Sequence, residues 1–409
     1  MLCLVAGLAA YLLTRPQRAV VPGPHAGSSQ GATGSAQDDA AAALVEKLAD
    51  RLARGTRSEV LALAAPGRAA ARAELADLYA NVRSLRIQDL SLRYVDDEPG
   101  RLDAAAERRL GGRAFVADVQ LGWRVAGYDP HVAREDTTLT LARTAHGAGF
   151  VTARGDYGKH VPLWMLDRLR VRRTPHTLVM AAPGAPLARF GGLADQAVRD
   201  VHKVLTSWRG RLVVEVPRDQ RELNLVLGSS DHTYDEIAAV TTTSDGSDRA
   251  SAPSHVFVNP PVFEPLGTRG SQIVMSHEAT HVATGAATVT MPTWLMEGFA
   301  DFVALDHVNL PVDVTASQIL AQVRKHGVPP HLPGKAEFDP SDPRLGASYE
   351  AAWLACRLIG ERYGEQKMIA FYRQASRDGS TDAAFHDVLG TTEPAFTASW
   401  RRYLHGLAR

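Results

Sequence analysis

Apolar residues recur at helical spacing near the start of the chain. Leu44, Leu48 and Leu52 lie four positions apart, and Leu75 lies three before Leu78. Residues three and four positions apart fall on one face of a helix, which can then pack on a core. The pattern therefore predicts helices over residues 40–54 and 68–81.

Runs rich in β-branched and aromatic residues follow, with turn residues between them, and each run predicts a strand. They cover residues 85–95, 114–125, 136–143 and 149–153. Helices followed by an antiparallel meander favour a curved sheet wrapped on helices. We expect one α+β accessory domain over residues 38–175, with Pro175 as its boundary.

In architecture this unit resembles the cone-shaped fold of the nuclear-transport-factor and ketosteroid-isomerase type. The resemblance implies a cone that can hold a ligand, but no acid and base pair within it stands out. Asp118 and Asp129 are expected at solvated strand edges, and Trp123 and Trp164 are expected in the core or at a domain contact. The basic run at residues 168–173 predicts a solvated strand or helix edge, with contact to a partner or to anionic lipid as the alternative.

Residues 176–409 predict a small mixed sheet followed by a helical C-terminal part. Short apolar runs indicate strands over residues 177–180, 212–216, 238–243 and 255–258, a helix over 193–208, and a strand or short helix over 223–227. Helical spacing predicts four further helices, over residues 351–363, 366–376, 381–389 and 394–404. A proline-rich stretch at residues 327–347 predicts a long loop before the first of these helices.

The first 13 residues form an uninterrupted apolar run with the length of the apolar part of a signal peptide. We therefore expect residues 1–14 to be a signal or membrane-anchor segment. Residues 15–37 are rich in Gly, Pro, Ser and Ala, as is typical of a flexible linker. This organisation favours a membrane-anchored or secreted protein on the extracytoplasmic side of a bacterial cell, although Arg15 and Arg18 alone would favour the cytoplasm.

Charge and cysteine content argue against nucleic-acid binding and against a structural disulfide. The chain has 45 basic and 45 acidic side chains, so its formal net charge is zero and nothing indicates nucleic-acid binding. Cys3 lies in the apolar run and Cys356 in a predicted helix, so no structural disulfide is expected.

The chemistry is concentrated in the sequence His277-Glu278-Ala279-Thr280-His281, an HExxH pentad. Apolar residues precede it and Gly285 follows as a helix C-cap, so a helix is expected. Residues four apart on a helix share a face, and both imidazoles can therefore bind one Zn²⁺ while Glu278 lies beside the open position of the metal.

A catalytic zinc site usually takes three protein ligands and a water molecule. Glu297 lies 16 positions after His281, and Asp301 lies one helical turn further on. If this segment is helical, Glu297 can bind the metal while Asp301 accepts a hydrogen bond from a ligand histidine and fixes its tautomer. The rival pattern HExxHxxGxxH is excluded, because the chain has Thr284 and Ala287 where it requires Gly and His.

Taken together, HEATH and WLMEGFAD resemble the gluzincin metallopeptidases, especially the bacterial peptidase MA-like group. The resemblance implies a thermolysin-like domain over residues 176–409 that binds one Zn²⁺ through His277, His281 and Glu297. It also implies Glu278 as the general base and Asp301 as the residue that orients a ligand histidine.

The same resemblance suggests Tyr349 as the donor to the oxyanion, with packing at a helix entry as its other interpretation and with His307 and His331 as weaker candidates. Gluzincins also bind extended peptides along an edge strand, and Ala239–Thr243 matches that segment, although it fits an ordinary sheet edge equally well.

The sequence thus predicts a zinc-dependent peptidase that acts on a peptide or protein substrate. The alternative is a catalytically silent scaffold that keeps the peptidase fold and recognises partners through its N-terminal domain; the intact Glu278 weighs against it. A hydrolase acting on a non-peptide amide or ester is a lesser third option.

Overall fold

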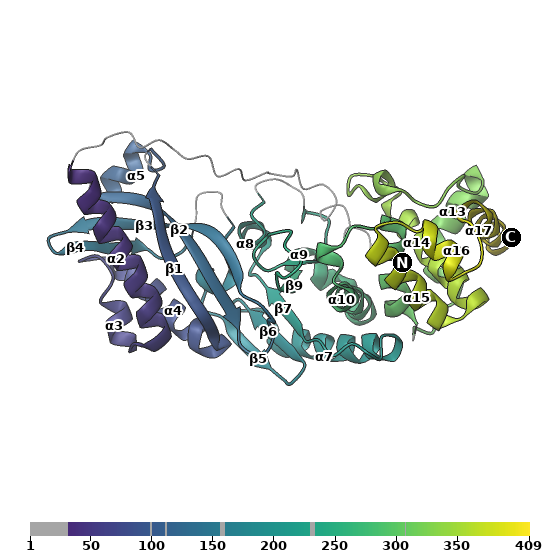
Figure 1. Ribbon diagram of the computed structural model, residues 1–409, viewed down its shortest axis with the longest axis horizontal. Helices are drawn as coiled ribbons and strands as arrows, with labels where there is room; N and C mark the ends of the chain where they lie inside the picture. The colour runs from purple at the N-terminus through teal and green to yellow at the C-terminus, as the bar shows by residue number, and fades with distance from the viewer. Residues whose placement is uncertain (1–31, 99, 111–112, 156–159, 230–233, 307) are drawn as a thin grey trace.

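The computed structural model describes residues 32–98, 100–110, 113–155, 160–229, 234–306 and 308–409. The predicted signal or anchor segment lies outside these ranges. Figure 1 shows a four-stranded sheet at one end of the molecule, a five-stranded sheet in the middle and a group of helices at the other end. The predicted α+β class, with small sheets and a helical C-terminal part, is confirmed.

The four-stranded sheet is an antiparallel meander in the order β1-β2-β3-β4, as predicted. Its strands are β1 (Ile87–Asp97), β2 (Ala114–Val125), β3 (Ala133–Thr144) and β4 (Gly147–Thr152). Helix α2 (Ala32–Arg54) packs on β1 and β4 (Figure 1), and it begins within the segment predicted as linker. Trp123 and Trp164 pack edge to face in the core, with ring centroids 6.2 Å apart, as expected.

Four further helices complete this part: α3 (Arg57–Leu61), α4 (Ala69–Leu85), α5 (Ala104–Arg109) and α6 (Leu163–Leu166). The short helices α3 and α5 were not expected, because neither is long enough to show an apolar period. Their N-terminal caps account for them locally. The Thr56 hydroxyl accepts from the Glu59 amide in a capping box, and the Asp103 carboxylate caps α5 by accepting from the Ala106 amide.

The second sheet is mixed, as predicted, with the strand order β5-β6-β7-β9-β8. Its strands are β5 (Arg170–Arg173), β6 (Thr177–Ala181), β7 (Leu212–Val216), β8 (Ala239–Thr243) and β9 (Ser254–Val258). Strands β6, β7 and β9 are parallel, whereas β5 and β8 are antiparallel edge strands. The basic run therefore forms an edge strand, but three of its arginines bond within the chain. Arg170 donates to the Ala185 carbonyl at 3.4 Å, Arg172 pairs with Asp195 at 2.7 Å, and Arg173 donates to the Leu85 and Ala126 carbonyls.

Helices cover this sheet and continue beyond it. The helices that follow β6 are α7 (Leu187–Val204), α8 (Gln220–Val226), α9 (Pro260–Phe263), η2 (Glu264–Leu266), α10 (Gly267–Thr284), η3 (Ala286–Thr288) and α11 (Thr293–Leu305). The C-terminal helices are α12 (Val312–Thr315), α13 (Ser317–His326), η4 (Lys335–Phe338), α14 (Leu345–Tyr363), α15 (Glu365–Asp378), α16 (Asp382–Asp387) and α17 (Glu393–Leu407). None of the helices in the described ranges is long and apolar enough to cross a membrane.

One prediction about the N-terminal unit is wrong. Asp129, expected at a solvated strand edge, is only 4% exposed and contacts the second sheet. Its Oδ1 lies 3.0 Å from Nε2 of His255 on β9, and Nδ1 of the same imidazole lies 2.7 Å from Oε1 of Glu215 on β7. Burial alone would lower the pKa of His255, but the two carboxylates outweigh burial and raise it to about 10. An imidazolium between two carboxylates thus joins the two sheets in the core, and only the folded chain brings these residues together.

Replacement of His255 by Gln is expected to destabilise the protein by ~3–5 kcal/mol at pH 6, because two buried carboxylates lose their counter-charge. The folded-state pKa of about 10 lies above the unfolded value of about 6.5. The contribution of His255 is therefore complete near pH 6 and is lost as the pH rises through 10. Urea unfolding of wild type and variant from pH 6 to 10.5 should show that the difference between their free energies of unfolding becomes smaller as the pH rises.

The matched control is His386→Gln, which removes an exposed histidine that also lies beside a carboxylate, that of Asp387. It should change the free energy of unfolding by less than ~1 kcal/mol at every pH. A gap between wild type and His255→Gln that stays constant from pH 6 to 10.5 would contradict the charged arrangement.

Candidate metal centre

Helix α10 carries the pentad and is buried along most of its length. Gly285 ends it in the left-handed conformation, with φ of 68°, as the C-cap that the sequence predicted. Ser276 donates a hydrogen bond to the buried Asp200 on α7 at 3.0 Å, which fixes the rotation of α10 about its axis. Because His277 and His281 are four residues apart on this helix, their imidazoles lie on one face, with ring centroids 4.7 Å apart.

Helix α11 brings the third donor. The Nε2 atoms of His277 and His281 are 3.0 Å apart, and they lie 3.2 and 3.4 Å respectively from Oε2 of Glu297. All three side chains are buried, and together they form a group that could hold one metal ion. The sequence predicted these three residues from the spacing of the pentad and from the resemblance of the segment around Glu297 to the gluzincins.

Gly298 allows the backbone of α11 to pack directly against α14. A Cβ atom placed there would lie 2.4 Å from the Ala352 carbonyl oxygen and 3.0 Å from Sγ of Cys356. Any side chain would force the two helices apart and would move the neighbouring Glu297. Gly298 stands within the motif, but nothing in the sequence shows that a backbone lies against it.

Asp301 lies one turn after Glu297, as predicted, and its Oδ1 is 2.7 Å from Nδ1 of His277. A proton on Nδ1 donates to this carboxylate and leaves the Nε2 lone pair for a metal. Among the residues that the structure describes, Nδ1 of His281 and Oε1 of Glu297 have no hydrogen-bond partner although both are buried. Unpaired buried polar atoms are costly, which is consistent with a site that holds an additional polar group.

The charges of the site are strongly coupled. Burial would raise the pKa of Glu297, but His281 and His277 outweigh burial and lower it to about 2. Burial would lower the pKa of His277, but Asp301 and then Glu297 raise it well above its usual value. Because a metal needs the unprotonated form of each imidazole nitrogen that binds it, protons compete with metal binding at this site.

Glu278 lies on the side of α10 that faces β8. Burial raises the pKa of its carboxyl group to about 7, against the opposing effect of both histidines. Oε2 accepts a hydrogen bond of 2.6 Å from the hydroxyl of Thr241, and Oε1 is buried without a partner in the described part of the chain. The sequence alone does not single out Thr241, because threonine is among the residues that are generally enriched in strands.

Tyr349 lies beside one of the metal-ligand candidates, with its ring centroid 6.3 Å from that of His277 and 5.1 Å from that of Phe338. It is 2% exposed and lies within α14, which begins earlier than the predicted helix entry. Of the two weaker candidates for the oxyanion donor, His331 and His307, the structure describes only His331 and does not place it beside His277. His331 is a largely exposed loop residue with Nδ1 3.8 Å from Glu337, and His307 lies outside the described residues.

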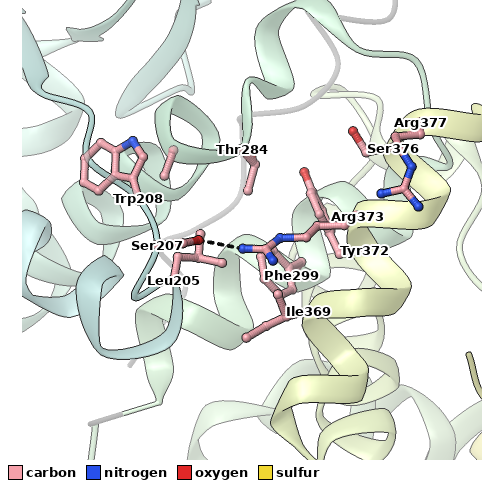
Figure 2. A pocket seen from close by; sticks show the side chains of 11 residues that line it. Leu205, Ser207, Trp208, Thr284, Phe299, Ile369, Tyr372, Arg373, Ser376 and Arg377 are labelled. Atoms are coloured by element: carbon pink, nitrogen blue, oxygen red, sulfur yellow. Dashed lines mark hydrogen bonds between the residues drawn. The ribbon is translucent and has the colours of Figure 1, made fainter.

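A separate pocket of about 300 Å³ lies beyond the C-terminal turn of α10. Figure 2 shows its lining, which comes from the segment that follows α7, from Thr284, from Phe299 and from α15. Arg373 donates across it to the Ser207 hydroxyl at 2.9 Å (Figure 2). None of the three metal-ligand candidates lines it, so this pocket is distinct from the metal centre.

Glu297→Gln should weaken zinc affinity by more than the ~10–100-fold that is typical of losing an outer-shell partner, because it removes a charged oxygen ligand. The matched control is Glu350→Gln, which neutralises another buried carboxylate on the adjacent α14. That carboxylate accepts from Ile319 and Gln318 and offers no atom to the metal group. Competition with a chromogenic chelator measures both affinities; equal losses in the two variants would contradict the assignment of Glu297.

The chain has no match among protein-family models or curated proteins. Function must therefore be inferred from the residues of the site itself.

Proposed function

We propose that this protein is a zinc-dependent peptidase of the gluzincin type. The observation that carries the proposal is the group of three buried donors, His277, His281 and Glu297, with the carboxylate of Glu278 beside it. Two imidazoles and one glutamate form the ligand set of several zinc peptidases, in which the fourth position is left for water.

The spacing of the donor atoms supports zinc. Tetrahedral zinc with ligand bonds of about 2.0–2.1 Å places its ligand atoms about 3.3 Å from one another. The three separations here are 3.0, 3.2 and 3.4 Å. Magnesium and calcium prefer sites made of oxygen ligands alone, so a group with two imidazole nitrogens disfavours both.

When bound, zinc would act as a Lewis acid that makes water acidic and polarises a substrate carbonyl. Glu278 would take the proton of the attacking water on Oε1, the oxygen that has no hydrogen-bond partner among the described residues. The water oxygen bonds to the carbonyl carbon, the C–N bond breaks, and Glu278 passes the proton to the departing nitrogen. Tyr349, held beside His277, would donate its phenolic hydrogen to the oxyanion.

The arrangement of elements around the site also favours a thermolysin-like domain. Strand β8 forms one edge of the mixed sheet, antiparallel to β9, and α10 packs against both strands. An extended peptide could pair with that edge, although an edge strand needs no such partner. The apolar run at residues 1–13 leads us to propose an anchored or secreted enzyme on the extracytoplasmic side.

Glu278→Gln should retain one zinc per chain and lose ~10²–10⁴-fold of peptidase activity, because an amide cannot accept the proton. Casein and a fluorogenic peptide library serve as substrates, and elemental analysis gives the zinc content. Glu350→Gln is the control and should keep its activity. A zinc-loaded wild type that cleaves none of these substrates would contradict the proposal and favour a silent scaffold; cleavage of esters alone would favour a non-peptide hydrolase.

Tyr349→Phe should lower kcat by ~10²–10³-fold with zinc content unchanged, because one donor to the oxyanion is lost. Tyr372→Phe is a matched control: Tyr372 is also buried, but it stacks on Phe299 with ring centroids 4.3 Å apart and lines the separate pocket. Steady-state kinetics on one peptide compare the two variants. Unchanged kinetics in Tyr349→Phe would remove this residue from the mechanism.

A further inference from the structure

We propose that Thr241 is a positioning residue for the general base, and this inference rests on the proposed peptidase function. Thr241 lies in the middle of β8, the edge strand beside α10, and is 1% exposed. Its hydroxyl oxygen lies 2.6 Å from Oε2 of Glu278 and 3.1 Å from the Glu278 backbone carbonyl oxygen. A single side chain of the sheet thus touches both the helix backbone and the carboxylate that it carries.

The hydroxyl of Thr241 has one hydrogen and two acceptors within reach, so the partner that receives it matters. The contact with the carboxylate is 0.5 Å shorter, and hydrogen bonds to ionised acceptors are shorter and stronger than those to neutral ones. The Glu278 carbonyl lies inside α10, where it accepts the amide hydrogen of the next helical turn. The hydrogen of Thr241 therefore goes to Oε2.

Occupying Oε2 has a consequence for Oε1. The last torsion of a glutamate side chain is broad, so a carboxylate without a partner samples many orientations. Thr241 holds one oxygen at a fixed point on the sheet, and within the described residues Oε1 has no hydrogen-bond partner. The atom that would take the proton is therefore presented in one direction, and a small error in direction costs much of the rate of a positioned reaction.

The strand that carries Thr241 is itself fixed. All five residues of β8 are paired with β9. Beyond its end, the Asp245 carboxylate accepts from the Arg134 amide of the N-terminal unit at 2.8 Å. A hydroxyl on this strand is thus a rigid point of attachment for Glu278.

The test compares Thr241→Val, Thr241→Ser and Thr243→Val. Valine keeps the shape of threonine and its preference for strands but has no hydroxyl, whereas serine keeps the hydroxyl. Thr243→Val is the matched control, because it removes a buried hydroxyl from the same strand without touching Glu278. Each zinc-loaded protein is measured for kcat and KM on one fluorogenic peptide that the wild type cleaves, for zinc content and for Tm.

The expected result is a kcat reduced ~10–100-fold in Thr241→Val with KM and zinc content unchanged, because a misplaced catalytic group loses rate on this order. Thr241→Ser should recover most of the activity, and Thr243→Val should match the wild type in kcat. A kcat within twofold of wild type in Thr241→Val, or equal losses in Thr241→Val and Thr243→Val, would overturn the inference.

Crystal structures of zinc-loaded wild type and Thr241→Val provide a measurement that does not depend on turnover. The Glu278 carboxylate should have one orientation in the wild type and should rotate or become disordered in the variant. An identical carboxylate in both structures would overturn the inference even if no peptide is cleaved. A wild type that binds zinc, cleaves nothing and still shows the difference would instead refute only the peptidase function.

Discussion

The structure depends on how it buries ionisable groups where α10 crosses α11. Two imidazoles and two carboxylates, from His277, His281, Glu297 and Asp301, lie there away from solvent. Charged groups are buried only when they are paired or bound to a metal, and each pairing at this site constrains a helix. The bond between Asp301 and His277 fixes the register of α11 on α10, while Gly298 allows the close contact with α14. The contacts that pair the buried charged groups are therefore the same contacts that fix how α10 and α11 pack.

A second buried charge cluster connects the two sheets. Asp129, Glu215 and His255 form it in the core, and the bond from Arg134 to Asp245 joins the N-terminal unit to the hairpin that ends β8. The buried apolar core runs without a break from α2 to α17. The N-terminal unit thus braces the sheet edge that carries Thr241, and it is connected to the candidate metal centre through contacts in the core.

The sequence predicted the parts of the site that lie on single elements. The i, i+4 spacings of His277 with His281 and of Glu297 with Asp301 define faces of helices, and a face can be read without knowing what packs on it. Strand order and short helices were harder, because α3 and α5 have capping residues but no apolar period. Asp129 was misjudged for the same reason that Thr241 and Gly298 were overlooked: each depends on a partner from a distant element, and no local pattern records that partner.

The central claim is that His277, His281 and Glu297 bind one zinc ion with a fourth position open to water. Zinc K-edge X-ray absorption of the purified, zinc-loaded protein measures this coordination directly. The account predicts four nitrogen or oxygen neighbours at about 2.0–2.1 Å, with the multiple-scattering signal of two imidazoles. Six oxygen neighbours without an imidazole signal, or a signal that persists unchanged when both histidines are replaced, would contradict it.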